Sequence, residues 1–588
     1  EIMQDTDLEG YEIMLAANEK VLVAEGATIA VSGVKTERNE VVNIAGDGAL
    51  LRVSAADQID VVRTGVNAEE GELIIEEGAM VSATSSMLLQ GTKDTLLSGD
   101  IQVGTENQAG SLYLGASQIS LSNDRDISTT GLILPTSTLE QFNLDELIIS
   151  SYGSLNIYNG IDLQLNNLKI EAAAINGIEN EGSVANITVA DTLTLSSPHQ
   201  SNVNLATDVE NGNGALNLNA GQIVIGSEVT DSNEEYISQS LALNGFSQVT
   251  MAASNGIVGK GDVQINFGNT GSNANLTLAT PMLTVASGSS LNLNAPNAQL
   301  DLASNSSDHT QPAFIGGKLS LNAESVNIAT RIDMSGGLVD INAVNDINID
   351  GTIDVSGQEK LFYDLTKYVP AGSVSLISQN GDVNINPSVD EDDIRIDVSS
   401  GSADGGKAGT LSIGASKGTV NLDGNIAASG VEKAGSILLD VGAYNNFDAL
   451  FATLNQSGFT DQIGIRLRNG DMNLGQVASN LYGSDITLTA DNGSINLDQI
   501  TIDASGDFSP SGKGGEIAIW ADKDLNVGSN SFLNTAATAA DSDGGNILLS
   551  SQNGTVVIDN GANINLSGAT GGDLQIRAER TDDDVKVA

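Results

Sequence analysis

Short segments in which apolar and polar residues alternate recur along the chain, most regularly between Lys318 and Gly357. Each segment has two apolar residues on either side of one polar residue. The apolar pairs are Leu319 and Leu321, Val326 and Ile328, Ile332 and Met334, Val339 and Ile341, Ile347 and Ile349, and Ile353 and Val355. Alternation at a period of two predicts β-strands with one buried face.

Every third strand repeats after about 20 residues, so that Leu319 corresponds to Val339 and Ile332 to Ile353. Strands this short do not form an independent sheet. A repeat of roughly 20 residues with three short strands is typical of a solenoid whose coils stack on one another. We therefore expect the apolar pairs to point inward and the residues between them outward. These outward residues are Ser320, Asn327, Asp333, Asp340, Asn348 and Asp354.

The turns between these strands hold three to six residues, unlike the two-residue Asn-Gly loops of antiparallel hairpins. Gly and Asn at corners supply the positive φ of a sharp bend, and stacked Asn side chains can form ladders. The same alternation occurs at 193–195, 216–218 and 291–293. The sequence therefore predicts an all-β fold, a single right-handed parallel β-helix over residues 1–588 with roughly 20–25 residues per coil.

Two insertions, at about 358–370 and 443–482, interrupt the pattern and contain many of the aromatic residues. In the second, four apolar residues recur at helical spacing between Asn446 and Gly458, which predicts an amphipathic helix with both ends marked. The insertions either cover an apolar strip of the solenoid or form a docking surface. The candidate contact residues are Phe447, Leu450, Phe451 and Leu454, together with Phe362, Tyr363 and Tyr368 of the first insertion.

Composition narrows the possible functions. The chain has 76 Asp and Glu against 24 Lys and Arg, a net charge of -52. Such a surface repels nucleic acid, because phosphate binding requires cationic side chains. Aromatic residues make up only 3%, which favours a narrow, layered core over a globular one. No run of 18 or more apolar residues occurs, so we expect no membrane insertion.

Candidate catalytic residues are few. The two histidines, His199 and His309, stand in turns rich in Ser, Asn and Asp, and we expect neither to act as a base or ligand. The densest acidic cluster, Asp390, Glu391, Asp392 and Asp393, is either a solvated turn or a loose calcium site, since hard cations favour clustered carboxylates. No other cofactor motif occurs, so the sequence predicts a protein without enzymatic activity.

One repeated module resembles a known family. Ile502-Asp503-Ala504-Ser505-Gly506 is followed by Gly514-Gly515-Glu516-Ile517-Ala518-Ile519, and related copies begin at 353, 396, 426 and 564. This module is similar to the repeats of filamentous-haemagglutinin-like exoproteins, the passengers of two-partner secretion in Gram-negative bacteria. The family's amino-terminal Asn-Pro-Asn-Gly signature has no match, because Asn386-Pro387 is followed by Ser388.

The resemblance implies a β-helical shaft of a larger protein, secreted through a partner pore in the outer membrane and located at the bacterial cell surface. Members of this class serve as adhesins, biofilm components or stalks that carry a toxin. The expected partners are therefore a host or neighbouring cell surface, or other copies of the chain. Two alternatives stay open: a subunit of a self-assembled extracellular filament or sheath, and a polysaccharide-acting enzyme on the same fold.

Overall fold

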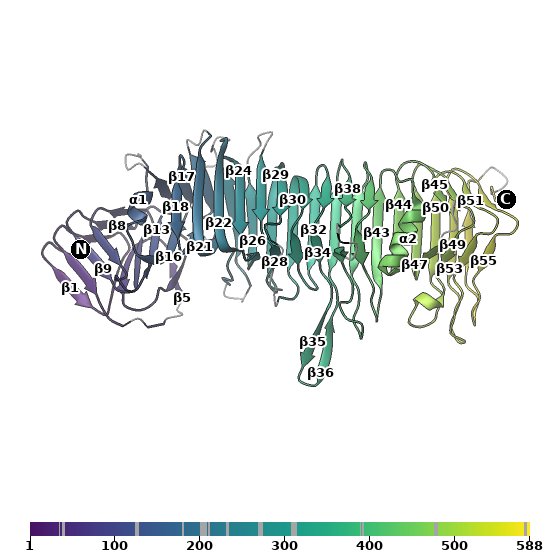
Figure 1. Ribbon diagram of the computed structural model, residues 1–588, viewed down its shortest axis with the longest axis horizontal. Helices are drawn as coiled ribbons and strands as arrows, with labels where there is room; N and C mark the ends of the chain where they lie inside the picture. The colour runs from purple at the N-terminus through teal and green to yellow at the C-terminus, as the bar shows by residue number, and fades with distance from the viewer. Residues whose placement is uncertain are drawn as a thin grey trace. The chain divides into compact units, whose positions relative to one another are not determined.

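The protein is nearly all β, with 57% strand and 3% helix, which confirms that the fold is all-β. The computed structural model describes residues 1–34, 36–37, 41–123, 129–178, 182–199, 209, 212–230, 235–268, 274–306, 314–388, 390, 393–475, 480–580 and 585–587. The chain divides into two compact units, Glu1–Thr310 (unit 1) and Gln311–Ala588 (unit 2), which are coloured purple to teal and teal to yellow (Figure 1). The expected single domain over 1–588 stays a prediction.

Three runs of parallel strands, called the first, second and third sheet, make up most of unit 2, and the chain visits them in turn; the second and the third are each interrupted once, after their first four strands. The first contains β30 (Lys318–Ile328), β32 (Leu338–Ala343), β37 (Ser373–Ser378), β40 (Thr410–Ala415), β43 (Gly435–Val441), β44 (Phe459–Leu467), β47 (Asp485–Ala490), β50 (Glu516–Ala521), β53 (Asn546–Ser551) and β56 (Leu574–Arg577). The second contains the end of β30, β33 (Ile347–Ile349), β38 (Val383–Ile385) and β41 (Val420–Leu422), then β45 (Met472–Leu474), β48 (Ile495–Leu497), β51 (Leu525–Val527) and β54 (Val556–Ile558). The third contains β31 (Arg331–Asp333), β34 (Thr352–Asp354), β39 (Ile394–Asp397) and β42 (Asn425–Ala427), then β46 (Asn480–Tyr482), β49 (Thr501–Asp503), β52 (Phe532–Asn534) and β55 (Asn563–Asn565).

The predicted register is confirmed in the stretch where the repeat is most regular. Leu319 pairs with Val339, and Ile332 pairs with Ile353. All twelve residues of the six apolar pairs are buried. The residues between them face outward and are half-buried, except Asp333, which is buried beside Arg331 with 3.2 Å between the Arg331 Nε and the carboxylate.

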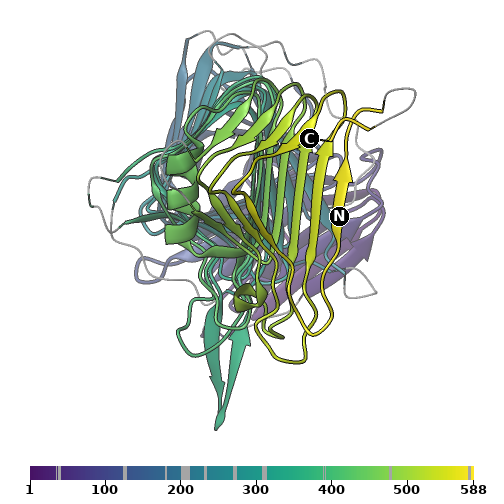
Figure 2. The same ribbon diagram turned by 90° about the vertical axis from the view of Figure 1, so that its right-hand side faces the viewer.

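The predicted coil length holds only where the connections between strands are short. Val374 pairs with Leu411, a much longer step than the one from Leu319 to Val339. Most of the extra residues lie in the connections from the third sheet back to the first, at 355–372, 398–409, 428–434, 504–515, 535–545 and 566–573. These connections gather on one side of unit 2 (Figure 2). The connection from β38 to β39, at 386–393, is also longer than the one from β33 to β34. Coil length therefore varies mainly at one corner.

Asparagine ladders run along the second sheet. The Nδ2 of Asn348 donates to the Oδ1 of Asn327 at 2.9 Å, Asn384 donates to Asn348 at 2.9 Å, and Asn421 donates to Asn384 at 2.8 Å. The sequence suggested ladders at the corners, but these side chains lie in the middle of strands, on their outward face. They stack there because parallel, in-register strands place identical residues about 4.8 Å apart.

Replacing a middle member of this ladder should loosen the coils on either side of it. Asn384→Ala removes two side-chain hydrogen bonds, so we expect a loss of roughly 1–3 kcal/mol. Hydrogen exchange of peptides containing β33 and β38 would report the loss. Ser375→Ala, at an outward position of β37, is the matched control and should leave protection there unchanged. Equal protection in both variants would contradict a stabilising role for the ladder.

The helix α2 (Phe447–Ser457) replaces two strands of one coil. It follows β43 and precedes β44, and it packs against β42, β45 and β46 of the second and third sheets. The side chain of Asn446 accepts a hydrogen bond from the Ala449 backbone N–H, and Gly458 ends the helix with a φ of 87°. The helix and its two ends are therefore as predicted.

The insertion that contains α2 is shorter than predicted. The expected insertion extended to residue 482, but β44, β45 and β46 already belong to the three sheets. The apolar residues of the helix stand where the inward residues of two missing strands would lie, and this gives them the same burial as core residues.

Unit 1 also contains three parallel runs of strands. One contains β10 (Ser86–Gly91), β13 (Gly110–Ala116), β16 (Leu144–Ser151), β19 (Asn167–Glu171), the ends of β21 (Val184–Ser196) and β22 (Gly214–Ile225), β25 (Ile257–Gly259) and β28 (Met282–Val285). The second contains β14 (Ile119–Ser122), β17 (Ser154–Tyr158), β20 (Ala174–Ile178), β23 (Ser238–Asn244), β26 (Asp262–Phe267) and the start of β29 (Ser290–Ala303). The third contains β18 (Asp162–Leu165), the starts of β21 and β22, β24 (Phe246–Ala253), β27 (Asn275–Ala279) and the end of β29.

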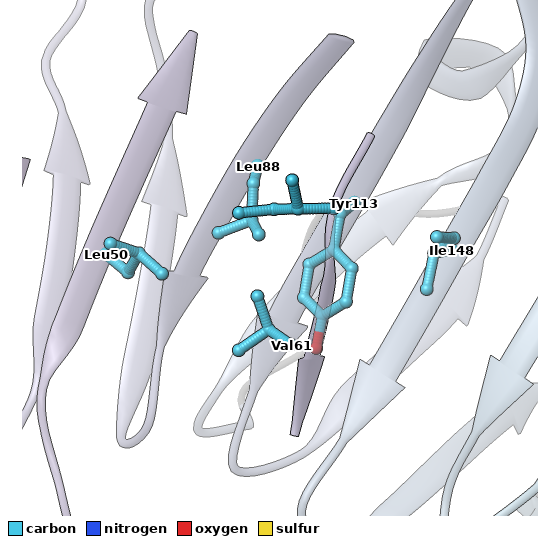
Figure 3. Close-up of a cluster of buried hydrophobic side chains, with 6 residues drawn as sticks. Leu50, Val61, Leu88, Tyr113 and Ile148 are labelled. Carbon is cyan, nitrogen blue, oxygen red and sulfur yellow. The ribbon is translucent and has the colours of Figure 1, made fainter. Parts of the chain in front are cut away.

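The beginning of unit 1 departs from this pattern. The strand β6 (Ala49–Ser54) pairs antiparallel with both β2 (Glu12–Ala17) and β10. A separate parallel pair, β5 (Val41–Ala45) and β7 (Asp60–Thr64), covers the outer face of this sheet. Beneath it lies a second core of Leu50, Ile59, Val61, Leu88, Tyr113 and Ile148 (Figure 3). Here both faces of a strand are buried, so apolar residues are consecutive and the alternation of the coils is lost.

Candidate interaction surface

The most exposed apolar side chains of unit 2 lie on a hairpin of β35 (Gln358–Phe362) and β36 (Leu365–Val369), within the first predicted insertion. The two strands form an antiparallel sheet of their own and project from the three parallel sheets (Figures 1 and 2). The turn residue Tyr363 has a φ of 57°, a left-handed conformation that is uncommon for a residue other than glycine. The tip of the hairpin therefore has a defined, tight turn.

Four apolar side chains at this tip are open to solvent. Leu361 is 70% exposed, Phe362 58%, Tyr363 101% and Leu365 53%. Single exposed apolar residues are common on protein surfaces, but contiguous groups of them mark contact sites. Of the seven predicted contact residues, Phe362 and Tyr363 are the two that the structure places in such a group.

One face of the hairpin combines this apolar tip with two cations. Lys360 lies directly opposite Lys367, and Phe362 lies directly opposite Leu365, so the four side chains share one face. Like charges in directly opposite positions destabilise a strand pair. Neither lysine has an ion-pair partner among the residues that the structure describes. An anionic partner that bound both ammonium groups would remove this repulsion.

The base of the hairpin is fixed by its other face. The Tyr368 ring packs on Gly405, where a Cβ would come within 2.4 Å of the ring carbon Cε2. Beside it, the Ser402 Oγ donates to Glu359 Oε2 at 3.2 Å. Tyr368 was also a predicted contact residue, but it is half-buried and anchors the hairpin to the neighbouring connection. On the face with the two lysines, Lys367 is exposed and Lys360 is half-buried.

The four helical contact residues are not available to a partner. Phe447 and Leu450 are each 2% exposed, and Phe451 and Leu454 are fully buried. The docking interpretation of these residues is wrong, because α2 takes the place of strands and its apolar face fills the core of unit 2. The polar face of the helix, with Asp448 in its first turn, faces solvent.

The acidic cluster is described only in part, because Glu391 and Asp392 lie outside the described residues. The Asp393 carboxylate accepts a hydrogen bond from the Ser388 Oγ at 2.9 Å, and its backbone N–H donates to the Asp390 carbonyl at 3.1 Å. Within the described part of the chain, no group of three His, Asp or Glu side chains is arranged to hold a metal ion. The calcium site stays a prediction.

A buried ionic network in unit 1 was missed by the sequence analysis. The Glu171 carboxylate lies 2.8 Å from the Lys169 Nζ and 3.1 Å from the His199 Nε2. The backbone N–H of Arg63 donates to the His199 Nδ1 at 3.4 Å. His199 was placed in a polar turn by the sequence analysis, and its side chain is only 4% exposed. The network joins β7 and the segment after β21 to the sheet that carries Glu171.

The same network contains a serine, yet its geometry differs from that of a catalytic triad. The Ser150 Oγ lies 2.7 Å from the His199 Nε2, the nitrogen that also faces Glu171. A triad needs the carboxylate on one ring nitrogen and the serine on the other. Here the other nitrogen accepts a backbone hydrogen bond, and Ser150 is buried. This arrangement can orient and neutralise charge, and it offers no nucleophile to a substrate.

Electrostatics explain how a buried carboxylate remains charged there. Burial alone would raise the pKa of Glu171, but the Lys169 ammonium and the hydrogen bond with His199 hold that pKa well below its ordinary value. Burial in turn would lower the pKa of Lys169, and the Glu171 and Asp60 carboxylates raise it above the ordinary value. Each charge therefore depends on the others.

The described helices are all too short to cross a bilayer as an apolar span. Comparison with known proteins adds no relative: no family model, no curated protein and no solved structure matches the chain.

Proposed function

We propose that this chain is a non-catalytic, β-helical segment of a secreted bacterial surface exoprotein of the filamentous-haemagglutinin-like class. The in-register parallel strands, the inward apolar pairs and the asparagine ladders of unit 2 support one right-handed parallel β-helix as the finer description of the fold. The proposed location is the cell surface, reached through an outer-membrane secretion pore.

The single observation that carries the function is the hairpin. Unit 2 presents a projecting hairpin whose tip is apolar and one face of which carries two lysines. In a chain with a net charge of -52, such an element is suited to a contact with another anionic surface, either a cell or a second copy of the chain. The proposed role is therefore adhesion or assembly, with Phe362 and Leu365 at the centre of the contact.

Removing the apolar tip should weaken that contact without affecting the fold. We expect Phe362→Ser combined with Leu365→Ser to lower binding at least tenfold, because two exposed anchors lose their apolar area. Binding is measured with fluorescently labelled chain on layers of bacterial and cultured mammalian cells, and self-association by sedimentation velocity.

The matched control is Val431→Ser, which alters a 55% exposed apolar residue outside the hairpin. It should bind as the parent does. A tip variant that adheres and associates like the parent would show that the hairpin is not the contact, and the proposed role would then be lost.

A further inference from the structure

Two sheets of unit 1 end at open edges. The strands β3 (Lys20–Val23), β8 (Glu72–Ile75) and β11 (Asp94–Leu97) form one sheet, and β1 (Asp7–Gly10), β4 (Thr28–Val31), β9 (Met80–Ala83) and β12 (Asp100–Val103) form another. Among the described residues, β11 and β12 are the last strands of these sheets. An edge strand presents unpaired N–H and C=O groups, which another strand can pair with.

A groove of about 590 Å³ lies beside these edges, within the size range of pockets that take a ligand. Leu112 and Leu114 of β13 belong to its lining and are buried, whereas Leu96 of β11 is 55% exposed. On the other side the groove meets β15 (Leu132–Pro135) and α1 (Thr136–Leu139). It is thus a recess lined by both apolar and polar side chains, next to the free edge of β11.

Two carboxylates complete the groove. Glu77 and Asp100 are among its lining residues, and both are exposed. The groove therefore combines apolar residues, a free strand edge and negative charge. The hairpin of unit 2 combines apolar residues, free strand edges and positive charge, the last from Lys360 and Lys367.

We propose that this groove of unit 1 receives the β35–β36 hairpin of a second copy of the chain. Phe362 and Leu365 enter the recess against the exposed Leu96, and the two lysines face Glu77 and Asp100. The inference rests on the proposed function, in which the hairpin is the contact, and it names the partner. The observation that favours another copy is this complementarity in charge and in apolar character between two surfaces of one sequence.

The contact is heterologous, because different surfaces of the two copies meet. Such contacts extend into open chains unless a rotation closes them into a ring. Copies with a net charge of -52 repel one another, so the two lysines must meet carboxylates for association to occur.

A mixing experiment tests the proposal with two variants of the full chain. The tip variant, Phe362→Ser with Leu365→Ser, keeps the groove. The groove variant, Leu96→Lys, keeps the hairpin and places a cation where the lysines should dock. Sedimentation velocity should show oligomers for the parent and monomers for each variant alone. An equimolar mixture should form dimers and nothing longer, since only one intact groove–hairpin pair exists between the two variants.

A mixture that stays monomeric, or a groove variant that associates like the parent, would overturn the proposal. If Leu96→Lys fails to fold, as judged by circular dichroism, Glu77→Lys with Asp100→Lys takes its place, because both residues are exposed. That variant should also regain association with a Lys360→Glu, Lys367→Glu partner. If the parent is monomeric and binds cells, and the tip variant no longer binds them, the groove is not the partner of the hairpin, but the proposed adhesive function is supported.

Discussion

Ile349→Asp should unfold the coils around β33, with a loss of roughly 3–5 kcal/mol. Ile349 is fully buried and pairs with Ile328 on one side and Ile385 on the other. A carboxylate at this position would enter an apolar core without a cationic partner, and its desolvation would not be offset. Urea unfolding of the variant and limited proteolysis near β33 would measure the effect.

Asn348→Asp is the matched control, because it adds the same charge one position away on the outward face. It weakens one step of the ladder and leaves the charge in contact with water, so we expect a loss of about 1 kcal/mol. If the two variants were equally stable, the inward assignment of Ile349 would be incorrect.

Glu171→Gln should destabilise unit 1 by about 3 kcal/mol, since it removes one partner of a buried pair and leaves charge behind. The glutamine keeps the volume of the side chain, but His199 loses its carboxylate and the Lys169 ammonium keeps only Asp60, at 3.4 Å. Lys169 is itself partly exposed, which limits the loss to the lower end of the usual range. Chemical unfolding at neutral pH would measure it, with Glu140→Ala, at an exposed glutamate, as the control.

The same carboxylate sets an acid limit for unit 1. The folded-state pKa of Glu171 lies below its ordinary value of 4.5, so its contribution is complete above that pH and declines as the pH falls further. The parent should therefore lose more stability than Glu171→Gln between pH 5 and roughly pH 2. Parallel acid unfolding curves for the two proteins would rule out this role for Glu171.

The coils of unit 2 were predictable because each strand carries its own signal. The burial of a pair such as Ile347 and Ile349 can be predicted from the local alternation of apolar and polar residues. The length of the repeat then predicts which residues of successive strands pair with each other. The ends of α2 were equally readable from Asn446 and Gly458. What the sequence did not show is that the helix replaces strands, because an amphipathic helix has the same pattern whether it covers a core or completes one.

The network of unit 1 could not be predicted for a different reason. Asp60, Lys169 and His199 are distant from one another in the sequence, and the residues that flank each of them give no sign of a buried ionic network. They meet only because β5 and β7 fold over a sheet whose strands are themselves far apart along the chain. The consecutive apolar residues around Leu88 and Tyr113 are the one local signal of that cover, since a strand buried on both faces loses its alternation.

The corner between the third and first sheets gives unit 2 an unusual freedom to change. The two ends of each connection continue the backbone ladder, as the Val355 N–H shows by donating to the Asp397 carbonyl at 2.9 Å and the Ala408 N–H by donating to the Lys433 carbonyl at 2.9 Å. Inserting or deleting residues in the middle of a connection therefore leaves the strand pairs intact and costs only a little loop-closure entropy. The hairpin occupies one such connection, at 355–372, and the next two, at 398–409 and 428–434, contain no hairpin. Each of these connections is a position where a lineage, or an engineer, can graft a new recognition peptide onto an unchanged scaffold.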